Sequence, residues 1–448
     1  MRSKNIFLAN CNVIKPMHIL VATNNFHVGG RETFIYNYIN YLKEKNNKAS
    51  LITSGFMETP ETGCFDRIIK CGTENYAQRW RAWLQKAEEY FRCNRISIIW
   101  AHHYDLLPVW LISKIYRVPV VTTFHGPLLD AGRPNDPMQA LGMTMAIHRE
   151  NAVSGVSKEV ISGIKNLAKC IKNKIYIIPN AVAINPTAMQ SDTLSKPIRF
   201  IIISRPEKLE HIRKAAQIFN FYQNKFGRSF LLIAGGETPN DRGEKDCRAM
   251  WKYISKVKTA IKYLGGKWCY KQGISFFRNL NNISFYGYTS RSKELIRNSD
   301  VVFGMGRVLL EGLAEGKPGI LVGYKNAHGI VTKENFETFR YSNFSGRGVS
   351  PQTTDDICNA IADFHKTGHC QDLSCLDSVS IENCGNKLEH IFKEIINSYS
   401  FQEDEVDFAK KLSQKIISYE YNSAKIFSRV CNTFTPQELY SLYKLIQG

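Results

Sequence analysis

The 448-residue chain carries 59 Lys and Arg against 40 Asp and Glu, a formal net charge of +19. Hydrophobic residues make up 44% and charged residues 22%, which excludes a disordered or fibrous protein and leaves enough apolar side chains for two large folding units. This excess of positive charge implies a negatively charged binding partner. Because no zinc finger or aromatic RNA-binding motif accompanies it, we favour anionic lipid or phosphorylated substrates over nucleic acid.

The twelve cysteines are scattered from Cys11 to Cys431. Their closest group, Cys370, Cys375 and Cys384, lacks the short paired spacings of a zinc site, so we expect reduced thiols and no metal. The basic N-terminus is followed only by the short apolar run IFLA, and no apolar run is long enough to span a bilayer. These features predict a cytoplasmic protein.

The first part of the chain has the pattern of a parallel α/β domain. A buried-type strand at 17–24 precedes the glycine pair Gly29-Gly30 and a helix from about Glu32. Further β-rich runs alternate with helical or irregular segments, as a parallel sheet with crossovers requires. They are KASLITSG, RISIIWAHH, VPVVTTFHG, AVSGVS and KIYIIPNAV. We therefore predict a Rossmann-like domain over residues 1–184.

A polar, proline-bracketed segment at 185–197 predicts an exposed interdomain linker. A second series of strand patterns follows it, and predicts a second Rossmann-like domain over 198–400. Its runs are IRFIIISR, SFLLIAGG, NISFYGY, SDVVFGM and GKPGILVGY. The helical pattern of 401–448 predicts a closing segment that packs back toward the N-terminal domain.

A basic and aromatic stretch interrupts the second domain at 250–273. Its apolar residues fall at helical spacing with lysines between them. A helix that docks on its own domain and an amphipathic helix that lies on a membrane both explain this pattern, and we prefer the first.

The most informative element is residues 299–324, which read as a strand, a glycine turn, a short helix and another strand. Gly304 and Gly306 let the backbone turn sharply and approach an anion, and the following helix offers unpaired N–H groups to it. Arg307 and Glu311 share a helix face and would present a cation to phosphate and a carboxylate to ribose hydroxyls. The alternative is a surface ion pair.

Together, these features resemble the GT-B glycosyltransferases, specifically the large retaining glycosyltransferase family four. The resemblance extends over roughly residues 17–400 and rests on several ordered motifs. It implies two parallel-sheet domains facing a central cleft, the N-terminal one for the acceptor and the C-terminal one for a nucleotide-sugar. It also implies transfer from a nucleotide-diphosphate-sugar donor, with a UDP-sugar favoured, and no metal or other cofactor.

The resemblance assigns roles to residues of the first domain. Gly29 and Gly30 match a paired-glycine loop that faces the donor diphosphate and the acceptor; an ordinary strand-helix turn is the alternative. His125, in TTFHG, matches a histidine that approaches the transferred sugar. Its place at a strand end supports this role, because ligands of open α/β sheets gather there. A capping or merely exposed histidine is the alternative.

In the second domain, ISRPEKLEHIRK resembles the segment whose arginine and lysine clamp the donor phosphates. These would be Arg205 and Lys208, although the usual interval lands on Glu210 and Lys214 competes for the cationic role. A guanidinium and an ammonium together suit a diphosphate leaving group.

Glu311 matches the second glutamate of the family's pair, which binds the ribose. The first glutamate is missing, because eight positions earlier the chain has Phe303. The chain resembles a subset in which a GMGR stretch replaces that site, so that Arg307 would supply a phosphate contact. Arg347 is a further candidate cation, with a surface arginine as the alternative.

We expect a metal-independent, retaining hexosyltransferase that acts on a glycan or lipid-linked acceptor in capsule or lipopolysaccharide synthesis. It would make peripheral contact with the anionic cytoplasmic face of the inner membrane. The rivals are a catalytically decayed GT-B scaffold, a GT-B epimerase, whose proton-moving carboxylates the sequence does not show, and a nucleic-acid-binding protein.

Overall fold

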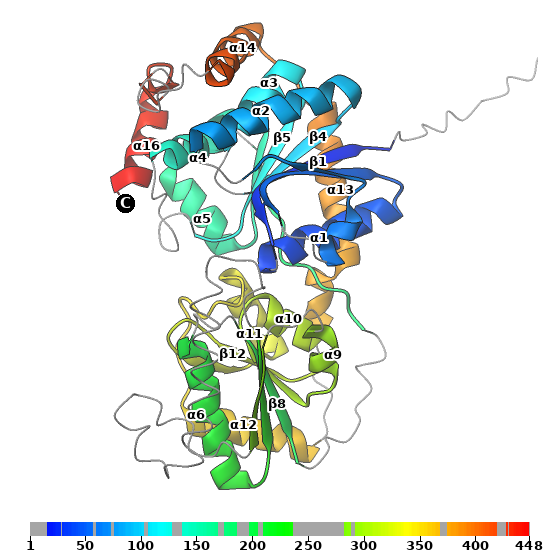
Figure 1. The fold of residues 1–448 in the computed structure, drawn as a ribbon. Coiled ribbons are helices and arrows are strands. Elements are labelled where there is room, and N and C mark those ends of the chain that lie inside the picture. The colour runs from blue at the N-terminus through cyan, green and yellow to red at the C-terminus, as the bar shows by residue number, and fades with distance from the viewer. Residues whose placement is uncertain are drawn as a thin grey trace, which may run out of the picture.

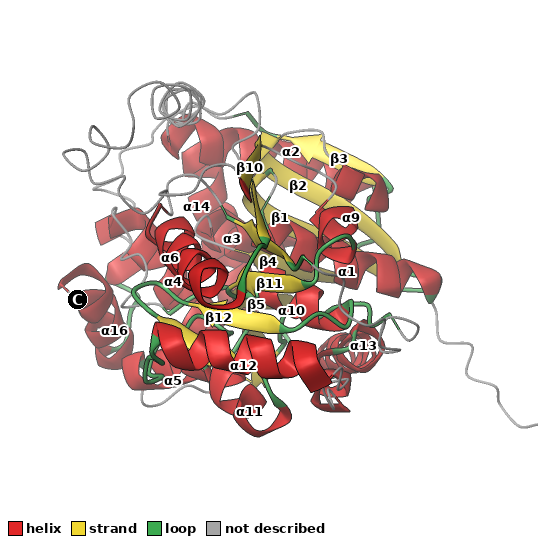
Figure 2. Cartoon of the chain, turned by 90° about the horizontal axis from the view of Figure 1, so that it is seen from below, coloured by secondary structure: helices red, strands yellow, loops and turns green. Residues whose placement is uncertain are grey.

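Two α/β domains form the protein, one above the other in Figure 1, and a view from below shows their sheets and covering helices (Figure 2). The computed structural model describes residues 16–27, 29–56, 60–72, 76–102, 106–127, 137–168, 174–185, 197–204, 209–235, 282–287, 292–367, 374–418, 427–428 and 430–447.

The N-terminal domain is built on a seven-stranded sheet in the order β3-β2-β1-β4-β5-β6-β7, in which all neighbouring strands are parallel. The strands are β1 (His18–Phe26), β2 (Lys48–Phe56), β3 (Arg67–Lys70), β4 (Ile98–His102), β5 (Val120–Phe124), β6 (Ala152–Gly155) and β7 (Lys174–Ile177). The connecting helices are α1 (Gly30–Glu44), η1 (Pro60–Cys64), α2 (Tyr76–Cys93), α3 (Leu106–Tyr116), α4 (Pro137–Arg149) and α5 (Lys158–Leu167). Every residue of β4 and β5 is buried, as expected of a parallel sheet covered on both faces.

The second domain has a six-stranded sheet in the order β10-β9-β8-β11-β12-β13, parallel except for the antiparallel β13. Its strands are β8 (Arg199–Ile203), β9 (Phe230–Ala234), β10 (Ile283–Gly287), β11 (Val301–Gly304), β12 (Gly319–Val322) and β13 (Ala327–Ile330). Its helices are α6 (Leu209–Phe226), α9 (Ser292–Arg297), α10 (Arg307–Ala314), α11 (Lys333–Tyr341) and α12 (Thr354–Thr367).

The predicted α/β architecture with two parallel-sheet domains is confirmed, and each predicted strand run contains an observed strand. Two strands were missed, β3 and β13. Each lies at the edge of its sheet and has only four residues, too few to show a clear periodicity. The basic stretch 250–273 and nearly all of the predicted linker lie outside the described residues.

The chain returns to the N-terminal domain earlier than predicted. After η3 (Ser374–Val379), helix α13 (Ile381–Asn397) packs into the N-terminal core, where the Phe392 ring lies 5.6 Å from that of Trp100. An apolar stripe with Leu388 at its centre drives this packing against α1. The boundary at residue 400 is therefore wrong, because α13 belongs to the N-terminal core.

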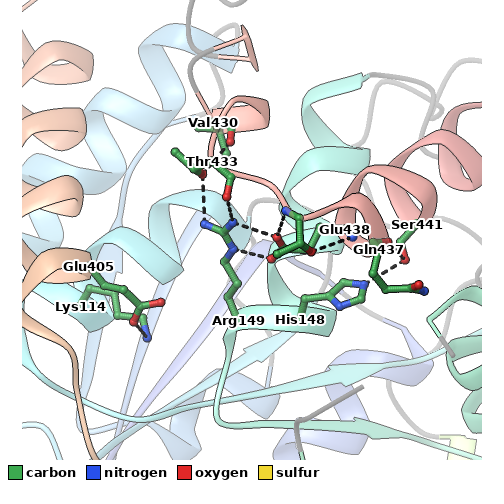
Figure 3. A network of polar contacts seen from close by, with 10 residues as sticks. Lys114, His148, Arg149, Glu405, Val430, Thr433, Gln437, Glu438 and Ser441 are labelled. Carbon is green, nitrogen blue, oxygen red and sulfur yellow. Dashed lines mark hydrogen bonds and ion pairs between the residues drawn. The ribbon is translucent and has the colours of Figure 1, made fainter. Parts of the chain in front are cut away.

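The last helices also pack on the N-terminal domain. Helix α14 (Glu403–Ile417) lies against α3, and α16 (Pro436–Gln447) against α4. Polar contacts fix both: Lys114 Nζ lies 2.7 Å from a Glu405 carboxylate oxygen, and Arg149 donates to Glu438 and to the Thr433 carbonyl (Figure 3). The C-terminal segment thus covers the helices of one sheet face (Figure 1).

The contact between α13 and α1 is close enough to predict a stability effect. A Cβ at Gly385 would overlap the Tyr41 ring, whose hydroxyl donates to Asn386. Gly385→Ala should therefore lower the free energy of unfolding by about 1–3 kcal/mol, measured by urea denaturation. The control is Gly163→Ala in α5, where a Cβ meets no atom within 4 Å and should be neutral or stabilise by up to about 1 kcal/mol. Equal effects of the two substitutions would contradict this packing.

Candidate functional site at the domain junction

The carboxyl ends of both sheets point toward the contact between the domains, which we call the domain junction. Figure 1 shows α1 and α5 at the lower end of the N-terminal domain, facing α10 and α11 of the other domain. Contacts cross the junction: Asn180 Nδ2 donates to Asn343 Oδ1 over 2.9 Å, and Arg347 pairs with Glu159. Ligands of open α/β sheets bind at such strand ends, so the predicted site residues that the structure describes lie on the expected side.

The glycine loop after β1 gathers charged groups that the sequence reasoning passed over. Gly29 caps α1 in an extended conformation, and a Cβ there would come within 2.6 Å of Glu32 Oε2. Glu32 is buried and pairs with Arg31, which also donates to the Asn25 carbonyl over 2.6 Å. Gly29 thus leaves room for Glu32, while Gly30 has open space around it. The letters RE directly after the glycine pair were the available signal.

His125 directly follows β5 and is held by other aromatic side chains. Its Nε2 lies 2.9 Å from Nδ1 of His102, and the Phe34 ring meets it edge-on at 4.9 Å. Burial, with a smaller contribution from the Arg31 charge, lowers the pKa of His125 to about 3. The imidazole is therefore neutral at neutral pH, and one ring nitrogen of the pair donates to the other. His102, at the end of β4, was not predicted.

The turn into α10 uses its two glycines in different ways. Gly306, the N-cap, has φ 57°, a conformation that favours glycine, and its N–H donates to the Phe344 carbonyl over 2.9 Å. At Gly304 a Cβ would lie 3.1 Å from the Leu309 nitrogen, so the strand end and the helix pack closely. The turn therefore places the first N–H groups of α10 at the end of β11.

Arg307 and Glu311 form an ion pair on α10, as the shared helix face predicts. Arg307 Nε donates to Glu311 Oε1 over 2.7 Å, and the side chains are only 13% and 21% exposed. The alternative of an ion pair is thus observed, but it is mostly buried. Arg307 Nη1 is also buried and has no hydrogen-bond partner in the described part of the chain. An anionic ligand would satisfy it, since an unpaired buried donor is costly.

Arg347 is neither a free cation nor an isolated surface arginine. Its Nε and Nη2 donate to the two carboxylate oxygens of Glu159 over 2.7 and 2.5 Å, and its guanidinium lies over the Tyr324 ring. Because Glu159 belongs to α5 of the other domain, this bidentate pair ties the two domains together.

Comparison with known proteins agrees with this geometry. Residues 28–185 match the model of Glycosyltransferase Family 4. The fold is similar to that of HepE from Anabaena in complex with UDP and glucose, with TM-score 0.57, 15% identity, and coverage of 84% of this chain and 100% of that one. The chain therefore has the GT-B fold, with two parallel-sheet domains.

Two other GT-B-like structures show how far the fold extends. A glycosyltransferase from Rickettsia africae has TM-score 0.53 and 16% identity, covering 86% of this chain and 100% of that one. UDP-GlcNAc 2-epimerase from Methanocaldococcus jannaschii has TM-score 0.50 and 10% identity, with 85% and 99% coverage. At these identities the likeness shows the fold alone. By sequence, no curated protein matches the chain.

Phe303, which stands in place of the family's first glutamate, lies in the core of the second domain. Its ring is fully buried and stacks on Phe200, 5.4 Å away, in the core of the second domain. Counting back eight residues from Glu311 thus reaches a core position, because this side chain points into the sheet packing and not toward the junction.

Two of the predicted site residues, Arg205 and Lys208, lie outside the described residues. Within the described ranges, no three His, Cys, Asp or Glu side chains gather into a metal site, and the cysteines there, including Cys375 and Cys384, are free thiols. In the same ranges no helix is both long and apolar enough to cross a membrane.

The lowered pKa of His125 predicts a pH effect on stability. Between pH 6.5 and about 3 the unfolded chain binds a proton that folded His125 does not, so this group destabilises the fold as pH falls. From pH 7 to pH 5, the free energy of unfolding of His125→Gln should gain about 1–2 kcal/mol relative to wild type.

Urea denaturation at the two pH values measures this difference. The control is Ile39→Val, a buried substitution in α1 without a titrating group, which should cost about 1 kcal/mol at both pH values. If the difference between His125→Gln and wild type were the same at pH 5 and pH 7, the neutral, buried state of His125 would be wrong.

Proposed function

We propose that the protein is a glycosyltransferase that moves a sugar from a nucleotide-diphosphate donor to a glycan or lipid-linked acceptor. The observation that carries the proposal is the mostly buried pair of Arg307 and Glu311 at the glycine-opened start of α10. It supplies an anion-binding helix end, an unsatisfied guanidinium nitrogen and a carboxylate within two turns. The family match of residues 28–185 supports the same activity.

The donor diphosphate would bind at the first N–H groups of α10 and at Arg307, and Glu311 would accept hydrogen bonds from the ribose hydroxyls. Arg205 and Lys208 follow β8, the strand beside β11, and we place them as further cations on the diphosphate. Negative charge builds on this group as the glycosidic bond breaks, so cations and oriented N–H groups favour the transition state. HepE in complex with UDP makes a UDP-sugar the preferred donor.

The neutral imidazole of His125 would hydrogen-bond to the transferred sugar and orient it, with His102 fixing its ring. At the start of α1, Gly30 leaves open space beside the backbone for the donor and the acceptor. We propose a retaining course without metal, in which the acceptor attacks from the face that the diphosphate leaves and the leaving phosphate takes its proton. No protein nucleophile takes part.

The net charge of +19 supports an acceptor at an anionic surface. We therefore place the reaction in cell-surface polysaccharide synthesis, with peripheral contact of the enzyme at the cytoplasmic face of the inner membrane. A decayed GT-B scaffold that still binds sugar nucleotides is the alternative.

The test is donor binding and hydrolysis across UDP-, GDP- and ADP-sugars. Wild type should turn over one donor, and Glu311→Ala and Arg307→Gln should each lower kcat/KM for it by about 100-fold, since each loses a charged contact to the transition state. The control is Glu389→Ala, which removes the carboxylate of another i,i+4 pair, with Lys393 on α13, and should leave kcat/KM unchanged.

Three other outcomes are possible, and each would count against a part of the proposal. Binding of one donor without turnover by wild type would favour the scaffold. No binding of any donor would contradict both the glycosyltransferase and the scaffold. Equal losses in Glu311→Ala and the control would remove α10 from the site.

A further inference from the structure

A broad cavity opens at the amino ends of the N-terminal sheet, on the side away from the domain junction. Its volume is about 1480 Å³, and its walls come from the starts of β1, β2, β3 and the residues before β4, and from the last turns of α2 and α13. Strand β1 runs nine residues from this edge toward the junction. At about 3.3 Å per residue, the strand separates the cavity from the junction edge of the sheet by about 26 Å.

The cavity walls are strongly basic. Six Lys and Arg side chains line it, against two carboxylates. The basic residues are Lys48, Arg67, Lys70, Lys86, Arg95 and Lys393, and the acidic residues are Asp66 and Glu89.

Part of this charge is not balanced by the protein. Lys86 pairs with Glu89 at 3.2 Å, and Asp66 pairs with Lys43 at 2.8 Å, so both acids are already engaged. In the described part of the chain no ion pair joins the exposed side chains of Lys48, Arg67 or Arg95 to a carboxylate. Three cations are therefore available to a ligand.

A hydrogen-bonded cluster of polar side chains lies beside these cations. His18 Nε2 lies 2.9 Å from Ser50 Oγ, which lies 2.6 Å from the Tyr90 hydroxyl. His18 is the cross-strand partner of Lys48, and Ser50 is that of Arg67. Partners in parallel strands point to the same face, so the hydroxyls and two of the free cations share one wall.

We propose that this cavity is a second binding site, separate from the donor site, for the phosphate group of a further ligand. A guanidinium and an ammonium on one wall match the several acceptor oxygens of a phosphate. The volume exceeds what a phosphate alone needs, so the rest of the ligand also fits. A soluble phosphate compound and a phospholipid head group present this same chemistry.

The test is calorimetric titration of the full chain with inorganic pyrophosphate, with saturating UDP present to occupy the donor site. Lys48→Gln/Arg67→Gln should weaken pyrophosphate binding by about tenfold or more, because two charge-assisted contacts are lost. The control, Lys410→Gln/Lys411→Gln, removes equal charge from exposed residues of α14 outside the cavity, and should bind within about twofold of wild type.

Vesicle sedimentation separates the two sources of phosphate. Binding to phosphatidylglycerol vesicles that is lost in Lys48→Gln/Arg67→Gln, but kept by the α14 control, assigns the site to a lipid head group. Loss of pyrophosphate binding alone assigns it to a soluble compound. Donor turnover should stay at the wild-type rate in both double variants, which shows that they are folded. If the two double variants bind pyrophosphate and vesicles equally well, the proposal is overturned.

Discussion

The two places where the chain crosses between the domains are hydrogen-bonded to each other, and the site depends on this contact. The Val182 N–H donates to the Val379 carbonyl, and the Ile381 N–H donates to the Val182 carbonyl. Beside them, Arg347 and Glu159 form a bidentate pair between the domains. Because both sheets end at this junction, the contacts that hold the domains together also determine where His125 stands relative to α10.

The charged side chains at the junction form ion pairs with one another. Arg307 holds Glu311, Arg31 holds Glu32, and Arg347 holds Glu159. Each carboxylate thus stays compensated without a ligand, which matters because an unpaired buried charge is costly. A donor would exchange partners within such a pair: its diphosphate would take Arg307, and its ribose hydroxyls would take Glu311. Burial, with a smaller contribution from the Arg31 charge, lowers the pKa of His125 and keeps it neutral.

The sequence predicted the features that depend on local pattern. Apolar runs predicted the buried parallel strands, and the glycine turn with charges at i and i+4 predicted a short helix with Arg307 and Glu311 on one face. Contacts distant in sequence were missed: no local pattern tells which core α13 joins, and nothing local pairs His102 with His125. Spacing put Phe303 in place of the first glutamate, but a residue count does not say which way a strand side chain points.

We propose that α10 holds the nucleotide of the donor, and a crystal structure of the full chain with UDP is the direct test. We expect the diphosphate at the Gly306 turn in contact with Arg307, and Glu311 turned from Arg307 to the ribose hydroxyls. UDP bound elsewhere, or bound here with the 2.7 Å Arg307–Glu311 contact intact and the ribose away from Glu311, would contradict it.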